Sequence, residues 1–487
     1  MADQGAAALA GTTTAPAARL EPDAISVAQD TVIGMASSAP AASIALTLPF
    51  LALATAYSSG LIIIITAVPM LIIANAYRRL NLWNANCGAS FEWVGRAISP
   101  YMGYFTGWLM IAAYVIATVS GVEVLGPSVL AVFGSNATST WGNIGIGTAV
   151  ALVMLIIAIV GIKITARTQV GMAAVEYAIL IGFAIVGLIF VLGHHAGTYP
   201  MTRDWWSVSG IGGKGSAVAG FLVAVFMFTG WDGTVYVNEE VRHRRANPGR
   251  AAMMAVALLA ILYAFASIGL QGAVSPAKLQ ANSSDVLVYV GNALGGSGWA
   301  KVMALSLALS VIATTGTGIV LTARIMYGMA SYRALPGILG NINRRFSTPV
   351  WASIVVGVLI IALTWIYLLA TTVQGAFDDV VDETGLLFAV FYVFTALATI
   401  TYYRRRLTRS VWDALVLGIL PLGAAAFLVW MFVKSVMVES WPLNWSLIGI
   451  AGVGIVLMLI ARLAGSSFFQ IGRESEPRSA HQAAHQA

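Results

Sequence analysis

The sequence predicts an all-α polytopic membrane protein with twelve transmembrane helices. Of its 487 residues, 59% are hydrophobic and only 9% are charged, and the mean hydropathy is +0.84. Apolar runs that approach or exceed the roughly 20 residues needed to cross a bilayer recur twelve times along the chain. This composition excludes a soluble globular protein, and the short segments between the runs exclude a large soluble domain.

The twelve predicted spans are joined by short loops and flanked by two tails. In chain order they cover residues 24–57, 60–77, 101–131, 144–162, 170–192, 216–239, 251–274, 299–329, 350–371, 386–403, 411–433 and 445–463. We expect a transporter core at 24–403, with inverted repeats at 24–193 and 215–403, followed by two additional helices at 411–464. Residues 1–23 and 465–487 are expected to be disordered cytosolic tails, and the first of them lacks a signal-peptide pattern.

The distribution of basic residues predicts the orientation. With a cytosolic amino terminus, all but five of the 26 lysines and arginines fall on the inner side. The five outer ones are Arg203, Lys214, Lys278, Lys301 and Lys434. The positive-inside rule therefore favours a plasma (inner) membrane protein with both termini in the cytoplasm.

The first span is interrupted. It contains Ser37, Ser38, Ala39 and Pro40 well inside an apolar run. A proline removes one backbone hydrogen bond of a helix, and small neighbours allow other groups to approach closely. We interpret this as a break that exposes backbone amides, although a proline kink without function remains an alternative.

The sixth span is interrupted in the same way. Its second half reads Phe-Met-Phe-Thr-Gly-Trp-Asp-Gly from Phe226 to Gly233, which predicts a break at Thr229, Gly230 and Gly233 with Asp232 beside it. Irregular backbone at membrane depth persists only where protein or water covers it. Interruptions in the first and sixth spans indicate an inverted repeat of five plus five helices with a central site between the halves.

Three segments resemble one transporter family. Residues 88–94, together with Arg96 and residues 103–108, resemble the segment between helices two and three of amino acid-polyamine-organocation permeases. Residues 323–330, 334–336 and 348–349 resemble the loop after the family's helix eight. Glu239-Glu240 and Asn247-Pro248 resemble the exit of its helix six. The resemblance implies a LeuT-like fold with helices one and six broken, and transport by alternating access.

Asp232 is the first candidate for substrate binding. A carboxylate inside a membrane is costly and is therefore interpreted first as functional. It can pair with a cationic amine, or it can take up and release a proton. The pair Trp231-Asp232 resembles that of polyamine-uptake members of the family, in which an aromatic face and an acid suit an ammonium group. The alternative is a capping aspartate bonded to free backbone amides. The predicted substrate-binding set is Ser37, Ser38, Ala39, Pro40, Tyr114, Phe228, Thr229, Gly230, Trp231 and Asp232.

Glu176 in the fifth span is a second candidate for proton coupling, beside Asp232. It follows Gly161 by fifteen residues, a spacing at which many sodium-independent family members have a lysine in place of a sodium ion. A glutamate there could titrate a proton or bind a second positive charge. A structural ion pair inside the bundle is the alternative.

Three further acids are predicted gate or vestibule residues. Glu123 lies 22 residues after Tyr101, near the outer end of the third span. Glu239 and Glu240 lie at the end of the sixth span, where they cap its cytosolic end or pair in an inner gate, and simple surface charge is the alternative. The break in the first span departs from the Gly-Ser-Gly pattern whose amides hold a substrate carboxylate in relatives. This departure favours an amine substrate that has no carboxylate.

These features predict a secondary transporter that imports or exchanges an amine, a polyamine or a cationic amino acid, coupled to protons. The chain has one cysteine, no Walker loop and no cofactor fingerprint, so we expect no enzyme, no metal and no cofactor besides the proton. A neutral amino acid permease or exchanger is the alternative, and a channel or a transporter-like nutrient sensor is a more distant one. Expected partners are the small-molecule substrate and the lipid bilayer, not nucleic acid, and the expected state is a monomer or weak homodimer.

Overall fold

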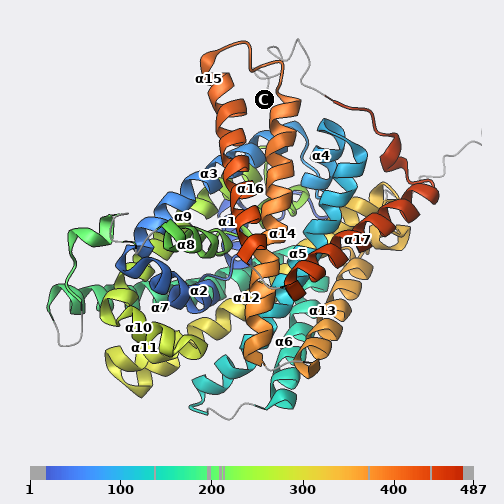
Figure 1. Cartoon of the computed structure of the whole chain (residues 1–487). Helices are drawn as coiled ribbons and strands as arrows, with labels where there is room; N and C mark the ends of the chain where they lie inside the picture. Colours follow the sequence, from blue (N-terminus) through green and yellow to red (C-terminus); the bar gives the residue numbers. More distant parts are fainter. Residues whose placement is uncertain are drawn as a thin grey trace, which may run out of the picture.

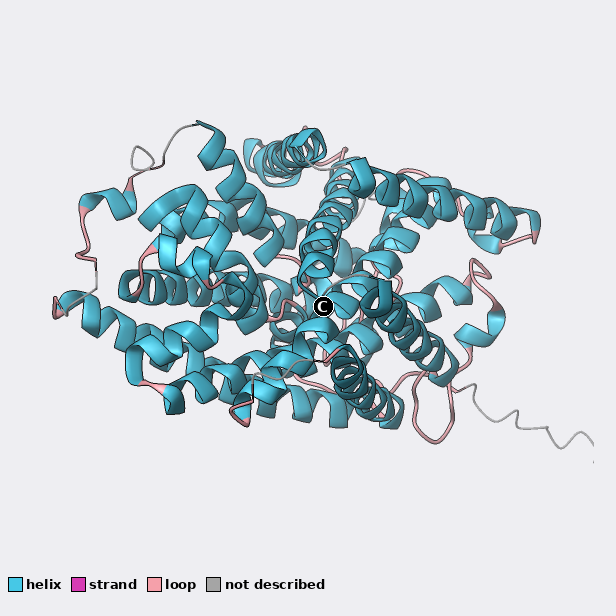
Figure 2. Ribbon diagram, turned by 60° about the horizontal axis from the view of Figure 1, so that its bottom comes forward, coloured by secondary structure: helices cyan, strands magenta, loops and turns pink. Residues whose placement is uncertain are grey.

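The computed structural model describes residues 18–474, except 136–138, 195–198, 208–210, 212–213, 371–372 and 439–440. Side chains are described for these residues apart from 123, 214–216, 370–383 and 438–444. Within this part of the chain the secondary structure is helical, with two isolated bridges and no strand (Figure 2). The prediction of an all-α protein is therefore confirmed.

Seventeen α-helices form the described structure (Figure 1). They are α1 (Val27–Ser37), α2 (Pro40–Thr55), α3 (Ser59–Trp83), α4 (Ser90–Ala97), α5 (Pro100–Val132), α6 (Thr140–Val160), α7 (Ile162–Leu192), α8 (Lys214–Met227), α9 (Asn247–Ala273), α10 (Pro276–Ala281), α11 (Val286–Gly295), α12 (Ser297–Ser331), α13 (Val350–Ala370), α14 (Val373–Tyr402), α15 (Val411–Ala414), α16 (Leu420–Val438) and α17 (Trp441–Leu463). Short 3₁₀ turns join some of them, including η4 (Trp231–Val235) and η5 (Asn238–Glu240).

Eleven helical stretches in the described part are long and apolar enough to cross a membrane. The first, Val27–Trp83, has 57 residues and covers the first two predicted spans. At about 1.5 Å per residue such a stretch exceeds the ~30 Å hydrocarbon core more than twice over, and Ala56 turns the chain within it at φ +49°. The structure therefore supports an integral membrane protein, while the count of twelve stays a prediction.

The loop predicted between the seventh and eighth spans contains two short helices, α10 and α11. Val286, Leu287 and Val290 on α11 are buried. This apolar face packs against α12, and burial of that face explains why the segment is helical rather than an open loop.

The helices differ in how deeply they lie in the bundle. The most apolar window of α12 is 83% buried and that of α5 is 76% buried, whereas the window of α17 is 11% buried. The α5 and α12 helices pack against each other at the centre, and α6 lies beside α13 (Figure 1). An apolar helix that the rest of the protein leaves uncovered needs lipid as its solvent, so α17 lies at the rim.

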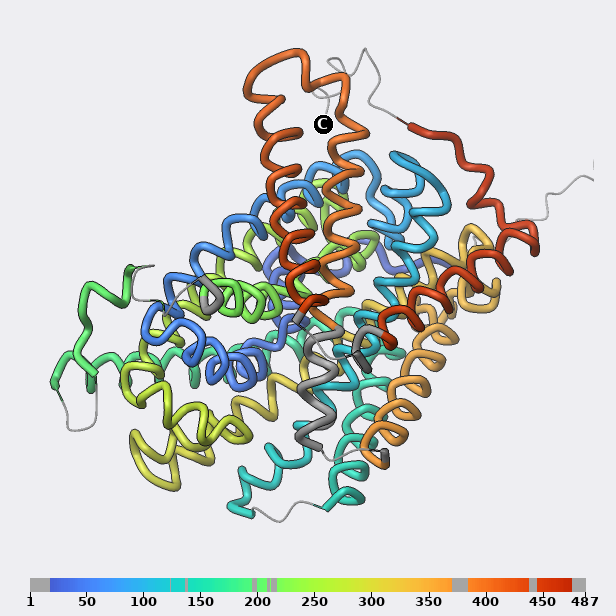
Figure 3. The backbone as a smooth tube through the Cα atoms, in the orientation of Figure 1, coloured from blue at the N-terminus to red at the C-terminus, as the bar shows by residue number. Residues whose placement is uncertain are grey.

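The carboxyl-terminal segment after α17 returns to α4 (Figure 3). The ring of Phe468 stacks on Phe91 with centroids 3.9 Å apart. Glu474 forms an ion pair of 2.5 Å with Arg96. Arg96 also pairs with Glu92 on its own helix. Residues 466–474, predicted to belong to a disordered tail, are thus packed against the bundle as far as the structure describes them.

Candidate functional site

The first break lies between α1 and α2. Helix α1 ends at Ser37, and Ala39 adopts φ +47° before Pro40 starts α2. A positive φ is unusual for a residue other than glycine and is found where surrounding contacts hold it. Here the Ser38 carbonyl accepts hydrogen bonds from Ser43 Oγ at 2.7 Å and from Tyr263 Oη at 3.3 Å.

The second break follows α8. The α-helix ends at Met227, and Gly230 adopts φ +94°. The sequence predicted a span that runs to residue 239, but the residues after the break form the 3₁₀ turns η4 and η5 instead of a second α-helical half. The interruption predicted at Thr229 and Gly230 is thus present, and the chain beyond it is less regular than expected.

The two breaks meet through their backbones. A Cβ on Gly230 would lie 2.5 Å from the Ser37 carbonyl oxygen, and a Cβ on Gly34 would lie 2.9 Å from the Trp231 carbonyl oxygen. Both contacts are closer than side-chain carbon atoms allow, so glycine is required for this approach. Tyr114 Oη of α5 donates to the Gly230 carbonyl at 3.3 Å, which ties a third element to the junction.

Asp232 lies directly after this junction and is fully buried. Tyr392 Oη on α14 donates to its Oδ1 atom at 2.6 Å. Tyr236 Oη, one turn further along the same segment, donates to Oδ2. The Tyr392 hydroxyl also accepts from the Gly230 amide at 3.4 Å. A capping aspartate would accept from free backbone amides, whereas the donors to Asp232 here are tyrosine hydroxyls.

Aromatic rings surround the Asp232 carboxylate. Trp231 stacks on Tyr392 with centroids 5.2 Å apart, and Tyr77 of α3 meets Trp231 edge-on at 5.1 Å. Tyr114 meets Tyr236 edge-on at 5.6 Å. All of these rings are buried, so Trp231 does not face lipid. We call Tyr77, Tyr114, Trp231, Tyr236 and Tyr392 the aromatic cage.

The cage holds a carboxylate without a counter-cation. Within the described residues, no lysine or arginine forms an ion pair with Asp232. Hydroxyl donors stabilise an ionised carboxylate, and electron-rich ring faces attract cations. The chemical group that this arrangement suits best is an ammonium ion.

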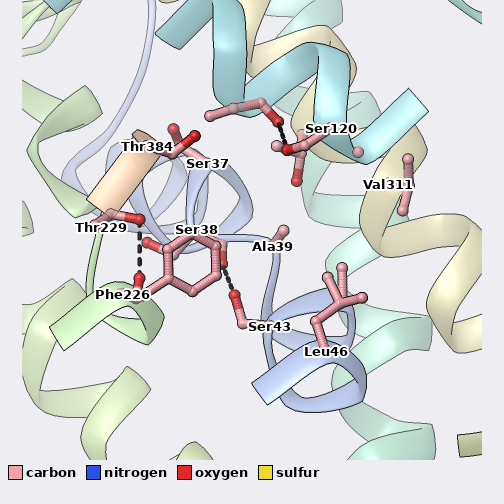
Figure 4. A pocket seen from close by; sticks show the side chains of 14 residues that line it. Ser37, Ser38, Ala39, Ser43, Leu46, Ser120, Phe226, Thr229, Val311 and Thr384 are labelled. Carbon is pink, nitrogen blue, oxygen red and sulfur yellow. Dashed lines mark hydrogen bonds between the residues drawn. The ribbon is translucent and has the colours of Figure 1, made fainter. Parts of the chain in front are cut away.

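A cavity of ≈ 50 Å³ lies beside the breaks (Figure 4). Ser37, Ser38 and Ala39 line it from the first break and Thr229 lines it from the second, and the remaining walls come from α2, α5, α8, α12 and α14. This volume holds a few water molecules but no amine substrate. Asp232, Trp231 and Tyr114 do not line it, and neither do Phe228 and Pro40, which are buried.

Glu176 of α7 caps the start of α2. Its Oε1 atom accepts the Ala41 amide at 2.9 Å, and Ser310 Oγ accepts the Ala42 amide at 3.3 Å. Glu176 is fully buried, and no described residue forms a hydrogen bond with its Oε2 atom. The ion pair considered for this residue is absent from the described part of the chain.

Glu240 forms a buried ion pair with Arg324 of α12. Arg324 Nη2 donates to Oε1 at 2.9 Å, Nε donates to Oε2, and both side chains are fully buried. Glu240 is therefore not a surface charge. Its neighbour Glu239 accepts the Cys87 amide at 3.1 Å. Burial raises the pKa of the Cys87 thiol well above its ordinary value, and the two glutamates add to the effect.

The remaining predicted acid, Glu123, lies on α5, which continues to Val132, and its side chain is outside the described residues. Sequence reasoning missed three members of the cage, Tyr77, Tyr236 and Tyr392, and the partner Arg324. Tyr236 follows Asp232 by four residues and could have been found by helical spacing. Tyr77 and Tyr392 come from distant segments, so nothing local indicated them.

Comparisons with known proteins agree with this architecture. A family model described as amino acid permease matches residues 26–456. The low-affinity putrescine importer PlaP of Escherichia coli is 24% identical over 417 residues, which cover 81% of this chain and 84% of that protein. The large neutral amino acids transporter small subunit 2 of Mus musculus is 25% identical over 247 residues, or 50% of this chain. The matched segment spans less than half of that transporter's length, at 43%.

Solved structures share the fold. The crystal structure of MhsT in complex with L-phenylalanine gives a TM-score of 0.61 at 15% identity and covers 85% of this chain and 99% of its own. A mutant manganese transporter from Eremococcus coleocola gives a TM-score of 0.61 at 13% identity, over 91% of this chain and 94% of its own. The family match over residues 26–456 identifies the chain as a member of the amino acid permease family, within the amino acid-polyamine-organocation superfamily.

Proposed function

We propose that this permease is a secondary active transporter that moves an amine or polyamine by alternating access, coupled to protons. The observation that carries the proposal is the fully buried Asp232 carboxylate, held by tyrosine hydroxyls inside the aromatic cage without a basic partner among the described residues. An ammonium group would supply the missing positive charge and would contact the ring faces at the same time.

The start of α2 supports an amine without a carboxylate. In a permease for α-amino acids, free amides at this half-helix would hold the substrate carboxylate. Pro40 has no amide hydrogen, and the amides of Ala41 and Ala42 are already bonded to Glu176 and Ser310. A substrate carboxylate placed here would also face the Glu176 side chain, and like charges repel.

The putrescine importer among the relatives supports the same substrate class, because the matched region covers most of both chains. The relatives named as neutral amino acid transporters favour the second candidate, a neutral amino acid permease or exchanger. Their matched regions are shorter, and the bonded amides of α2 count against that candidate.

The cavity beside the breaks is too small for an amine. Because Asp232 is fully buried, we assign the conformation to an occluded state in which the Glu240–Arg324 pair closes the side predicted to be cytosolic. Substrate reaches Asp232 after the cage opens. Its ammonium group then replaces some of the tyrosine hydroxyls as a hydrogen-bond donor to the carboxylate.

A thermal-stabilisation panel tests the substrate class. Purified protein is heated with putrescine, butylamine, arginine, leucine or phenylalanine, because a ligand that binds the folded state raises its apparent stability by mass action. We expect stabilisation by the two amines and none by leucine or phenylalanine. Stabilisation by the neutral amino acids alone would refute the amine proposal and support the second candidate.

A further inference from the structure

We propose that Asp30, on the inner half of the first broken helix, is a proton-binding site that couples transport to protons. The inference rests on the proposed function and deepens it, because it assigns the coupling proton to one side chain. Asp30 was not among the acids that the sequence singled out.

The Asp30 carboxyl group is buried without a hydrogen-bond partner among the residues that the structure describes. Its side chain is fully buried, and neither Oδ1 nor Oδ2 has a hydrogen-bond partner. The two other buried acids near the breaks differ, because Asp232 accepts two tyrosine hydroxyls and Glu176 accepts the Ala41 amide. Asp30 is thus the acid of this group that no described residue supplies with a hydrogen bond.

Helix capping does not explain the residue. The first turn of α1 already has a capping box, in which Ser26 Oγ accepts the Gln29 amide and Gln29 Oε1 accepts the Ser26 amide. The Asp30 amide bonds to the Ser26 carbonyl at 3.0 Å. The amino terminus of α1 is therefore satisfied without the Asp30 side chain.

Asp30 lies one helical turn before the point at which α1 contacts η4. Asp30 precedes Gly34 by four residues and so lies on the same helix face. Gly34 contacts η4 so closely that a Cβ there would lie 2.6 Å from Thr234 Cγ2. Thr234 Oγ1 is also buried, and it has no hydrogen-bond partner in the part of the chain that the structure describes. The α1 face that contains Asp30 is therefore packed closely against η4, the segment that contains Asp232.

Within the described part of the chain, no charged group compensates Asp30 from the elements that pack most extensively against α1, which are α7, α9, α12 and η4. Their ionisable side chains are Lys163, Arg167, Glu176 and Tyr177 on α7, Arg250 and Tyr263 on α9, Lys301, Arg324 and Tyr327 on α12, and Asp232 on η4. Asp30 forms no hydrogen bond or ion pair with any of them. Lys163 pairs with Glu21, Arg324 pairs with Glu240, and Arg167 and Arg250 are exposed.

These surroundings destabilise the ionised carboxylate much more than the protonated acid, since an unpaired charge is far more costly to bury than a neutral polar group. The closed contact between α1 and η4 therefore forms with the proton on Asp30. When α1 moves away from η4 and water enters, the O–H bond breaks, the proton passes to water and the carboxylate stays on the helix. The contact closes again after the carboxylate has taken up a proton from water.

Proteoliposomes with an alkaline interior test the assignment. A gradient of about one pH unit supports roughly tenfold accumulation when one proton moves with each substrate. For Asp30→Asn we expect this gradient-driven accumulation of labelled putrescine to be lost, while exchange against internal putrescine and thermal stabilisation by putrescine remain. Asp30→Glu should restore accumulation. The matched control is Asp285→Asn, because Asp285 is an exposed acid outside the site, and it should accumulate substrate as the wild type does.

Accumulation by Asp30→Asn at the wild-type level overturns the assignment. The assignment is also overturned if Asp30→Asn loses both exchange and accumulation while it still folds and is still stabilised by putrescine. That result would make Asp30 a general structural element. A failure of the substrate proposal gives a different result: putrescine neither stabilises the wild-type protein nor enters proteoliposomes that contain it. Proton uptake, followed by a pH-sensitive dye inside the liposomes, then tests Asp30 with whichever amino acid stabilises the protein.

Discussion

Asparagine at position 232 removes one negative charge and little else. The Asp232 carboxylate accepts hydroxyls from Tyr236 and Tyr392 and has no basic partner in the described chain. An asparagine amide can accept from one hydroxyl and donate to the other, because a tyrosine hydroxyl both donates and accepts. We therefore expect the unliganded variant to lose no more than about 1 kcal/mol of stability.

Amine binding should fall much further. Loss of one partner from a buried, hydrogen-bonded charge pair costs about 2–5 kcal/mol, and each ~1.4 kcal/mol is a tenfold change in Kd. Asp232→Asn should thus weaken putrescine binding by roughly 30-fold to several thousand-fold. Because a single carboxylate contacts a single ammonium, butylamine should lose about the same factor as putrescine.

Calorimetric titration of purified protein in detergent measures both affinities, with Asp285→Asn as the control for loss of an acid outside the site. A change of less than about threefold in amine affinity would refute the cage as the ammonium site. A large loss for putrescine with none for butylamine would mean that Asp232 binds the second charge of a diamine instead.

Four further predictions concern the elements around the cage. Glu240→Gln leaves its buried arginine without a counter-charge, so the closed state should lose about 3–5 kcal/mol, measured as a lower unfolding temperature. Burial raises the pKa of the Cys87 thiol, so at neutral pH maleimide should react with Cys87 more than about tenfold more slowly than with the thiol of free glutathione. Glu240→Gln should speed this reaction. Glu176→Ala should cost about 1–2 kcal/mol through loss of a helix cap, whereas Glu176→Gln should keep most of that stability. Gly230→Ala should lower the unfolding temperature more than Gly296→Ala, because both positions have positive φ but a Cβ has open space at Gly296; equal shifts would contradict the role of close backbone contact.

The fold class could be predicted because hydropathy is a property of local sequence. The interruption near Gly230 could also be predicted, since glycine and an acid inside an apolar run are visible without any partner. The form of the chain after the break could not, because the 3₁₀ turns η4 and η5 depend on the helices packed around them.

The candidate site was predictable only in part. Asp232 and Trp231 are adjacent in sequence, whereas Tyr77 and Tyr392 come from the third and fourteenth helices and reach the carboxylate only through tertiary packing. The capping contact of Glu176 joins residues 135 positions apart. The isolation of Asp30 was equally invisible, because the absence of a partner can be established only after every neighbour is placed.

The contact between the two breaks has a consequence for protein engineering. The chain segments at Ser37 and Gly230 touch through main-chain atoms, which substitutions elsewhere leave in place. The ring of Tyr77, in contrast, comes from α3 and reaches the site through its edge-on contact with Trp231. A library that varies Tyr77 and keeps Tyr392, whose hydroxyl bonds to the Gly230 amide, therefore changes the lining around Asp232 while the crossing point of the broken helices is preserved. Selectivity can then be redesigned without disturbing the contact between the two breaks.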